Sequence, residues 1–562
     1  MSALRFFAAQ INPTVGDLAG NVALHQHAHH MAAKAGADLV VFPEMSLAGY
    51  PPDDLALNPD FLDACEQAVV SLAALTQQGP AMLLGAPLRQ KSFPTLAAPP
   101  LNAAWLLAEG RVQQVVGKRH LPSYEEFYDT RIFASAMMSE PMRLKGVHLG
   151  VMICEDVWFA DVAAQLKNAG AQVLVTLNAS PFAKGKASQR LDHVLRARVR
   201  ETGLPLLYVN MVGGQDELVF DGGSLALHAD GAIAWQAPAW QEDFSSLTLH
   251  NQMWEISHGH ASPPRTHEGD IYQALLLACR DYWRKNGCTR AVVGLSGGID
   301  SALVAALLVD ALGPEQVQGM LLPSHVTSHE SNQLAQQLAH NVGMTWRTLP
   351  IETVAHTVAE TLKAGGVNPH AGHTFDNVQS RTRGVLLMAA TNAQAGTLLA
   401  STGNKSEVAL GYCTLYGDTN GGFNPLKDVY KTEVYALAHW RNAHTPHNAL
   451  GPSGVVIPPA IITRTPTAET RADQSDEKSL GYPYALIDQI LTLHVDDDQP
   501  WRAIVAQVGN EAAVRHILAL VQRAQYKRQQ ACPGPKISRR AFGRSRQYPI
   551  VNRFNPFHDE AI

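Results

Sequence analysis

Short apolar runs alternate along the chain with longer segments of mixed polarity. Such runs predict buried strands, and the segments between them predict helices. In the first half the predicted strands are residues 4–11, 37–42, 81–86, 101–107, 148–153, 173–177 and 204–211. In the second half they are residues 291–293, 318–322, 346–350 and 397–401. Strands that alternate with helices indicate an α/β fold in both halves.

One turn of the second half has the composition of an anion site. It joins the strand at 291–293 to an apolar helix at 302–312. Its residues are Gly294, Leu295, Ser296, Gly297, Gly298, Ile299, Asp300 and Ser301. Glycines let the backbone approach a ligand, and the free N–H groups at a helix start bind phosphate. Asp300 would repel phosphate unless a cation such as Mg²⁺ lies between them. For a serine and two glycines alone, a plain strand-to-helix turn is an equal alternative.

The complete SGGIDS sequence is more specific. It resembles the pyrophosphate loop of ATP pyrophosphatases, which cleave ATP between the α and β phosphates. The resemblance implies a substrate that is activated as an adenylate.

Two reactive side chains of the first half follow predicted strands, and a third follows the segment 111–117. Glu44 follows residues 37–42, Lys118 follows residues 111–117, and Cys154 follows residues 148–153. Taken singly, they would be a surface carboxylate, a solvated amine and an inert core thiol.

Their local sequences VFPE, GKR and MICED resemble the Glu-Lys-Cys motif of the nitrilase (carbon–nitrogen hydrolase) superfamily. The resemblance implies an α-β-β-α sandwich. It also implies that Cys154 attacks an amide carbonyl, Glu44 transfers the proton, and Lys118 stabilises the oxyanion. Glu126 is the expected auxiliary carboxylate, with Glu125 as the alternative.

Beyond Cys154 the likeness narrows to the glutamine-hydrolysing branch of that superfamily. It implies that Tyr124, Ser180 and Lys186 bind glutamine. Without the family, Lys186 and its neighbour Lys184 would be interpreted as solvated charges.

Further motifs of the second half are LPS, NVQSRTR, TGNKSE, TLYGD, GGFNP and PTAE. With SGGIDS they resemble NAD⁺ synthetase domains, and the whole chain resembles the glutamine-dependent NAD⁺ synthetase family over nearly its full length. The resemblance implies a doubly wound parallel sheet in an ATP-dependent carbon–nitrogen ligase.

The expected ATP contacts are the turn at 294–301, Thr402, Lys431 and Thr467. The expected Mg²⁺ ligands are Asp300 and Glu407. The expected deamido-NAD⁺ contacts are Asn377, Arg381, Glu407 and Lys527. The sequence departs from many relatives at Thr470 and Ala472, so no site is assigned there.

The implied reaction has two centres in two domains. Residues 1–256 would release ammonia from glutamine, residues 257–267 would form a linker, and residues 268–562 would adenylate deamido-NAD⁺. Ammonia would then displace AMP and give NAD⁺. Because ammonia is protonated in water, we expect a shielded route between the centres. Domains of this family associate, so at least a dimer is expected.

Composition narrows the alternatives. The net charge is −6, which argues against nucleic acid as a partner and against an RNA-modifying amidotransferase with the same phosphate loop. A nucleotide sensor with inactive centres is a second alternative, which the intact reactive residues disfavour. Six scattered cysteines and the lack of a long apolar run favour a cytoplasmic protein without a membrane segment.

Three further segments carry expectations. The histidines at positions 25, 27, 29 and 30 are expected on a solvated helix face rather than at a metal. Residues 475–479 are expected to form a mobile lid. The basic residues 527–553 are expected to form a partly ordered tail that touches a neighbouring subunit.

Overall fold

The structure is a computed structural model that describes residues 3–90, 98–259, 265–467, 471, 475–554 and 556–557. The chain divides into two compact units, Met1–Pro264 and Arg265–Ile562. Residues 260–264 of the predicted linker lie outside the described residues. Each unit is described below by itself.

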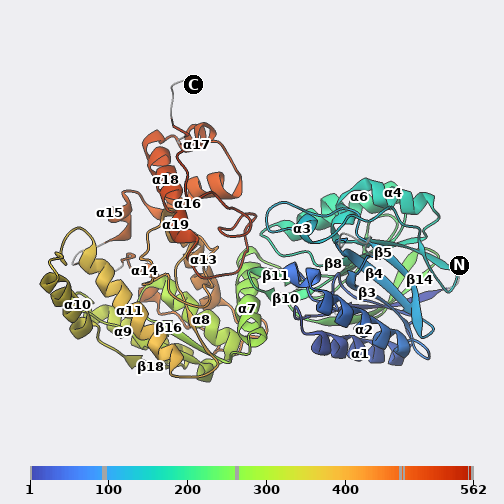
Figure 1. The fold of residues 1–562 in the computed structure, drawn as a ribbon, viewed down its shortest axis with the longest axis horizontal. Coiled ribbons are helices and arrows are strands. Elements are labelled where there is room, and N and C mark those ends of the chain that lie inside the picture. The colour runs from blue at the N-terminus through green and yellow to red at the C-terminus, as the bar shows by residue number, and fades with distance from the viewer. Residues whose placement is uncertain are drawn as a thin grey trace. The chain divides into compact units, whose positions relative to one another are not determined.

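Two sheets lie face to face in the first unit, with helices on both outer sides (Figure 1). The first sheet has the order β15-β14-β1-β2-β3-β4-β5, and the second has the order β13-β12-β9-β8-β7-β6. The strands of the first sheet are β1 (Leu4–Gln10), β2 (Leu39–Val41), β3 (Ala81–Leu88), β4 (Leu101–Ala108), β5 (Arg111–Gly117), β14 (Asp243–His250) and β15 (Met253–His258). Those of the second are β6 (Met142–Leu144), β7 (Val147–Ile153), β8 (Val173–Asn178), β9 (Leu206–Asn210), β12 (Leu225–Leu227) and β13 (Ile233–Gln236).

The core of this unit has three apolar layers. Side chains of both sheets meet between them, as Phe6 of β1 and Val151 of β7 do. The outer layers lie under α1 (Leu18–Lys34) and α2 (Pro59–Leu75) on one side and α4 (Ala160–Asn168) and α6 (Arg196–Thr202) on the other. The predicted α-β-β-α sandwich is confirmed. The remaining elements are α3 (Asp129–Ile132), α5 (Lys186–Gln189), β10 (Val212–Gln215) and β11 (Leu218–Asp221).

The expectation of a solvated histidine face on α1 is wrong for two of its four members. His25 and His29 are buried together with Ala28 and Ala32. Positions four apart lie on one face of a helix, and this face packs on the first sheet. The His25 ring is within hydrogen-bond distance of the Asn21 carbonyl at 2.7 Å and of Ser46 Oγ at 3.0 Å. Burial lowers the pKa of His25 to about 4.

The second unit is built on a parallel sheet with the order β18-β17-β16-β19. Its strands are β16 (Arg290–Gly294), β17 (Val317–Leu321), β18 (Thr345–Thr348) and β19 (Thr397–Ala400). The strand order reverses between β16 and β19, so the sheet is doubly wound, as predicted. Ligands of such sheets bind beyond the carboxyl ends of the strands at this reversal.

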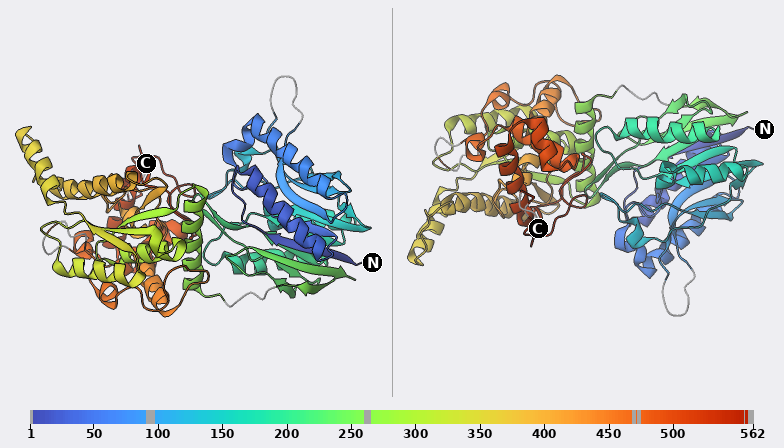
Figure 2. Two further views of the ribbon diagram at one scale, coloured as in Figure 1. Left: turned by 90° about the horizontal axis from the view of Figure 1, so that it is seen from below. Right: turned by 90° about the horizontal axis from the view of Figure 1, so that it is seen from above.

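The helices of this unit precede, connect and follow the strands. They are α7 (His267–Lys285), α8 (Ile299–Leu312), α9 (His329–Val342), α10 (Glu352–Ala364), α11 (Thr374–Asn392), α12 (Lys405–Leu410), α13 (Lys431–Ala443), α14 (Pro459–Thr463), α15 (Asp476–Leu480), α16 (Tyr484–Leu491), α17 (Trp501–Val508), α18 (Glu511–Arg523) and α19 (Gln525–Arg528). Both views of Figure 2 show α10 and α11, in yellow tones, along one outer side of the unit. Among the described residues, no helix has both the length and the apolarity of a membrane span.

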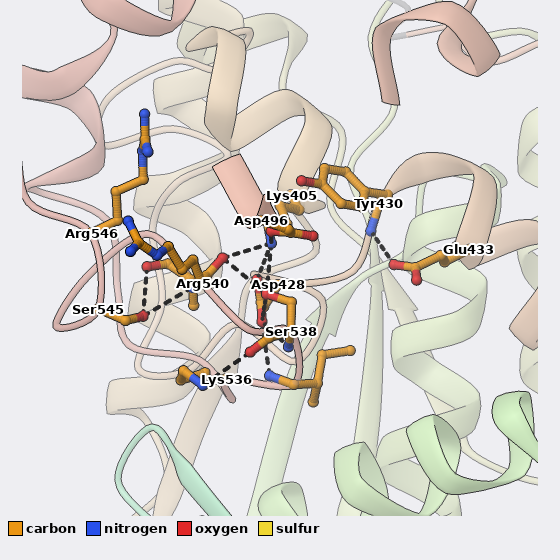
Figure 3. Close-up of polar contacts among 12 residues, drawn as sticks. Lys405, Asp428, Tyr430, Glu433, Asp496, Lys536, Ser538, Arg540, Ser545 and Arg546 are labelled. Atoms are coloured by element: carbon orange, nitrogen blue, oxygen red, sulfur yellow. Dashed lines mark hydrogen bonds and ion pairs between the residues drawn. The ribbon is translucent and has the colours of Figure 1, made fainter. Parts of the chain in front are cut away.

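A buried ammonium connects the C-terminal segment to the rest of the second unit (Figure 3). Lys405 Nζ lies 2.7 Å from Asp428 and 2.7 Å from Asp496, and it donates to Ser538 Oγ and the Arg540 carbonyl. Asp428 also accepts from the backbone N–H groups of Ile537 and Ser538. This part of the basic tail therefore packs inside its own unit. A contact with a neighbouring subunit stays a prediction.

Candidate active sites

The carboxylate of Glu44 lies at the centre of a buried polar cluster in the first unit. β2 ends two residues before Pro43, and the Glu44 side chain has no exposed surface. Its Oε1 accepts from Asn102 Nδ2 at 2.7 Å and from Lys118 Nζ at 2.8 Å. Its Oε2 accepts from the Ala179 N–H at 2.9 Å. These donors stabilise the negative charge of the carboxylate that was expected to act as the base.

Lys118 contacts a second carboxylate that the sequence did not reveal. Its Nζ lies 2.7 Å from Asp129 Oδ2, and Asp129 Oδ1 accepts from the Tyr50 hydroxyl at 2.9 Å. The nearby carboxylates raise the pKa of Lys118 well above its usual value, against the opposing effect of burial. The Lys118 ammonium is therefore charged, and the carboxylates of Glu44 and Asp129 both hold it in place. Glu126 is also buried, and its auxiliary role stays a prediction.

Cys154 lies on a strained turn directly after β7. Its φ angle is 45°, in the left-handed region that residues with a side chain rarely adopt. It begins the short 3₁₀ helix Cys154–Trp158. Strain of this kind persists where the surrounding structure fixes the residue, and it is common at active sites.

A buried aspartate fixes the segment of Lys118 to the turn of Cys154. Asp156 Oδ1 accepts from the N–H groups of Arg119 at 3.0 Å and His120 at 2.8 Å. Its Oδ2 accepts from the N–H of Ile153 at 3.1 Å. This side chain thereby joins the end of β5 to the end of β7.

The charges of Glu44 and Lys118 both act on the thiol of Cys154. Burial is the largest effect and raises the pKa of Cys154 well above its usual value. Glu44 raises this pKa further, whereas Lys118 lowers it. The three predicted catalytic residues therefore meet in one buried site, where the resting cysteine is a thiol.

Two of the three expected glutamine contacts, Tyr124 and Lys186, lie close to the carboxylate of Glu155. The Tyr124 hydroxyl donates to Glu155 at 2.9 Å, and the charge of Lys186 acts on the same carboxylate. The Tyr124 ring and Lys186 Nζ both lie against the ring of Phe127. Ser180 is buried nearer the core, and its N–H donates to Asn210 Oδ1 at 3.0 Å. The group combines a negative charge, a positive charge and an aromatic face.

The loop at 294–301 in the second unit, which was expected to bind phosphate, is held by hydrogen bonds of its own serines. Ser296 Oγ and Ser301 Oγ lie 3.0 Å apart, and the Gly298 N–H donates to Ser296 Oγ. Gly297 has a φ angle of 78°, and a Cβ there would lie 2.4 Å from the Ser331 carbonyl oxygen. Only glycine fits this position without strain. Helix α8 then begins at Ile299.

Carboxylates from the two strand ends at the sheet reversal meet at Lys431. Its Nζ forms a short ion pair with Asp300 and lies 3.6 Å from Glu407 Oε1. Burial raises the pKa of Glu407 to about 8, and Asp300 raises it too. Asn404 caps α12 by accepting from the Glu407 N–H, and it donates to Asp300 at 2.9 Å. Clustered carboxylate oxygens are the ligands that Mg²⁺ prefers, so the residues fit this ion.

The expected deamido-NAD⁺ contacts gather around one loop, residues 411–418. Asn377 accepts from Thr414 Oγ1 at 2.9 Å, and Arg381 Nε donates to the Leu415 carbonyl. Lys527 Nζ donates to the carbonyls of Gly411 and Cys413. Three distant segments are thus brought together. Only Glu407 of the expected set belongs to the carboxylate cluster.

The two remaining expected ATP contacts are Thr402 and Thr467. Thr402 lies between β19 and α12, and Thr467 directly precedes residues 468–470, which are outside the described residues. Thr470 and Ala472 also lie outside the described residues. The expected lid at 475–479 contains α15, whose Asp476 is buried and accepts from the Tyr412 hydroxyl at 3.3 Å.

Comparison with known proteins gives two family matches. The carbon-nitrogen hydrolase family matches residues 8–255, and the NAD synthase family matches residues 271–531. The chain is 45% identical to the glutamine-dependent NAD(+) synthetase of Rhodobacter capsulatus over 98% of both chains. It is 40% identical to that of Synechocystis sp. over 98% of both chains.

Solved structures agree with these matches. The glutamine-dependent NAD⁺ synthetase of Acinetobacter baumannii, solved in complex with ADP, is 35% identical with a TM-score of 0.77. That alignment covers 98% of this chain and 99% of the other. The enzyme of Cytophaga hutchinsonii has a TM-score of 0.80 at 20% identity and supports the fold, over 98% of each chain.

Proposed function

From the premise that this chain belongs to the family of glutamine-dependent NAD(+) synthetases, we propose which of its residues perform each step. The chain is an ATP-dependent carbon–nitrogen ligase that makes NAD⁺ with nitrogen from glutamine. The roles of single residues, the metal ion, the oligomeric state and the cytoplasmic location are proposals.

In the first unit, Cys154 Sγ attacks the side-chain carbonyl of glutamine while Glu44 accepts the thiol proton. Lys118 stabilises the oxyanion of the tetrahedral intermediate. Glu44 returns the proton to the leaving nitrogen, so ammonia departs and a thioester remains. Water then attacks the thioester with Glu44 as the base, which releases glutamate and restores the thiol. The contact of Lys118 with Glu44 beside the strained cysteine is the observation that carries this proposal.

Glutamine is held by opposite charges at its backbone end. The Glu155 carboxylate suits its ammonium group, and Lys186 suits its carboxylate. Tyr124 donates to Glu155 and keeps that carboxylate in place. We assign Ser180, which is buried nearer the core, to the amide end of the substrate.

In the second unit, the nicotinate carboxylate of deamido-NAD⁺ attacks the α-phosphorus of ATP, and pyrophosphate leaves. Ammonia attacks the resulting acyl-adenylate, and AMP leaves with the formation of the amide. The loop at 294–301, with Thr402, Lys431 and Thr467, binds ATP. Asn377, Arg381, Glu407 and Lys527 bind deamido-NAD⁺.

The second centre also requires a divalent cation. Asp300 and Glu407 would hold Mg²⁺, which neutralises phosphate charge when it is bound. Lys431 lies between these carboxylates and can move its ammonium toward the β and γ phosphates.

Self-association is proposed from the outer side of the second unit. Val354 and Val358 lie one turn apart on α10 with exposed side chains, and Trp346 is exposed on the edge strand β18. Apolar side chains of this kind are typical of an interface with a second copy. A cytoplasmic location is supported by six cysteines, none of which forms a disulfide.

The test is an assay of NAD⁺ and AMP from deamido-NAD⁺ and ATP, with either glutamine or ammonium. Cys154→Ala should reduce glutamine-driven synthesis at least ~10⁴-fold, because the nucleophile is lost. Ammonium-driven synthesis should be unchanged. Cys288→Ala, which removes a thiol outside both sites, is the matched control. Full glutamine-driven activity of Cys154→Ala would refute the assignment.

A further inference from the structure

A cluster of two histidines and a glutamate lies in the second unit, and none of the three residues has been assigned a role above. It consists of His325, Glu352 and His356. His325 belongs to the loop after β17, whereas Glu352 and His356 are four apart on α10. Residues four apart share one face of a helix, so both can reach the same ion.

The ligand atoms of these side chains converge on a common point. One ligand atom from each residue lies within 4.8 Å of the other two. His325 Nδ1 is 3.1 Å from Glu352 Oε2, and His356 Nε2 is 2.6 Å from Glu352 Oε1. Around Zn²⁺, with bonds of about 2.0–2.1 Å, tetrahedral ligand atoms are about 3.3 Å apart. Small side-chain movements would therefore produce a coordination sphere.

The backbone holds the histidine that comes from the loop. The His325 N–H donates to Glu352 Oε2 at 3.0 Å, which joins the loop to the first turn of α10. The same loop is closed by a bond from the Ser324 N–H to Thr327 Oγ1. The His356 ring also lies 5.7 Å from the ring of Phe375, on the next helix. The three ligands are thus positioned before any ion binds.

We propose that His325, Glu352 and His356 form a binding site for a borderline divalent metal ion such as Zn²⁺. Two imidazoles and one carboxylate suit Zn²⁺, Ni²⁺ or Cu²⁺, whereas Mg²⁺ prefers oxygen ligands. The site therefore differs in its chemistry from the carboxylates Asp300 and Glu407. Three protein ligands leave one tetrahedral position for water. A bound ion would fix the loop after β17 to α10.

The test uses the full chain without a histidine tag, stripped of metal, and a chromophoric chelator that competes for Zn²⁺. We expect one equivalent of Zn²⁺ to bind per chain at this site, with an affinity that excess Mg²⁺ does not change. His325→Ala and His356→Ala should each weaken this binding at least ~10-fold, since even indirect contacts of a zinc ligand are worth that much. Glu352→Gln should also weaken it.

The matched control is His340→Ala, which removes an exposed histidine of α9 outside the cluster. Circular dichroism establishes that each variant is folded. Co²⁺ gives a second measurement, because its visible absorption reports nitrogen coordination and should disappear in His356→Ala. Absence of Zn²⁺ binding, or binding that the three variants leave unchanged, would overturn the proposal and leave a hydrogen-bonded surface cluster.

Discussion

In the first unit the ammonium of Lys118 lies between two carboxylates that have further donors of their own. Glu44 also accepts from Asn102 and Ala179, and Asp129 also accepts from Tyr50. In the second unit Lys431 likewise contacts two carboxylates, Asp300 and Glu407. There, however, burial and the nearby negative charge of Asp300 raise the pKa of Glu407 to about 8.

The difference shows what each centre needs before it can react. In the first centre, hydrogen bonds within the protein hold Glu44 and Lys118 before a substrate binds, and the group that reacts is a neutral amide. In the second centre the raised pKa of Glu407 favours its protonated form, and a bound cation would favour the carboxylate instead. Ser296 and Ser301 of its loop contact each other, and Lys527 donates to the Gly411 carbonyl. We expect phosphates and a nucleotide to replace these contacts. Substrate binding must therefore reorganise the second centre more than the first.

The largest expected effect tests the cation requirement of the second centre. Asp300→Asn should reduce NAD⁺ formation ~10³-fold with glutamine and with ammonium alike, because the cation that would stabilise the leaving pyrophosphate loses a ligand. Glutamine hydrolysis, measured as glutamate release, should persist. Asp497→Asn, an exposed position of the same unit, is the control. Wild-type synthesis by Asp300→Asn would show that the Asp300 carboxylate has no role in catalysis.

The next effect concerns the stability of the first unit in acid. Burial lowers the pKa of His25 from 6.5 to about 4, so the folded state resists a proton that the unfolded chain accepts. The contribution of neutral His25 to the free energy of unfolding is fully present above pH 6.5 and is lost as the pH falls toward 4. It amounts to at most about 3 kcal/mol.

His25→Gln should therefore weaken the acid sensitivity of the first unit. Hydrogen exchange of peptides from α1 between pH 6.5 and 4 measures it. His494, which burial also shifts to a pKa of about 4, lies in the second unit and is the internal control. If the peptides around His494 lose their pH dependence in His25→Gln as well, the effect is not local.

The smallest effect tests whether the first centre depends on its second carboxylate. Asp129→Asn should lower the turnover of glutamine about 10²-fold, because Lys118 would lose one of its two anchors and shift. Ammonium-driven synthesis should keep its wild-type rate. Asp216→Asn, at an exposed turn of the first unit, is the matched substitution. An unchanged glutaminase rate in Asp129→Asn would mean that Glu44 alone positions Lys118.

Motifs and strand ends predicted much of this arrangement. Glu44, Lys118 and Cys154 each follow a strand, and they meet because the first sheet, with β2 and β5, packs face to face with the second sheet, which contains β7. The supporting residues had weaker signals. Asn102 is a polar residue within an otherwise apolar strand, which is a signal for a buried hydrogen bond. Asp129 lies in no recognised motif, because its role arises only from contacts with Lys118 and Tyr50.

The error at the histidines of α1 has a different cause. His25 and His29 alternate with Ala28 and Ala32 at helical spacing, so the sequence did place them on the apolar face. The polarity of histidine predicts exposure, whereas the helical positions of His25 and His29 predict burial. A histidine can be buried when its ring nitrogens find partners, as those of His25 do with Asn21 and Ser46.

The buried Lys405 has a consequence for the biogenesis of the protein. It lies three residues after Thr402, within the segment that carries Glu407, and its ammonium needs Ser538 Oγ and the Arg540 carbonyl as partners. The segment that carries Glu407 therefore lacks two of its contacts until residues 536–540 have left the ribosome. A chain shortened before residue 536 would leave this ammonium without those two partners, so the segment that carries Glu407 should be less stable.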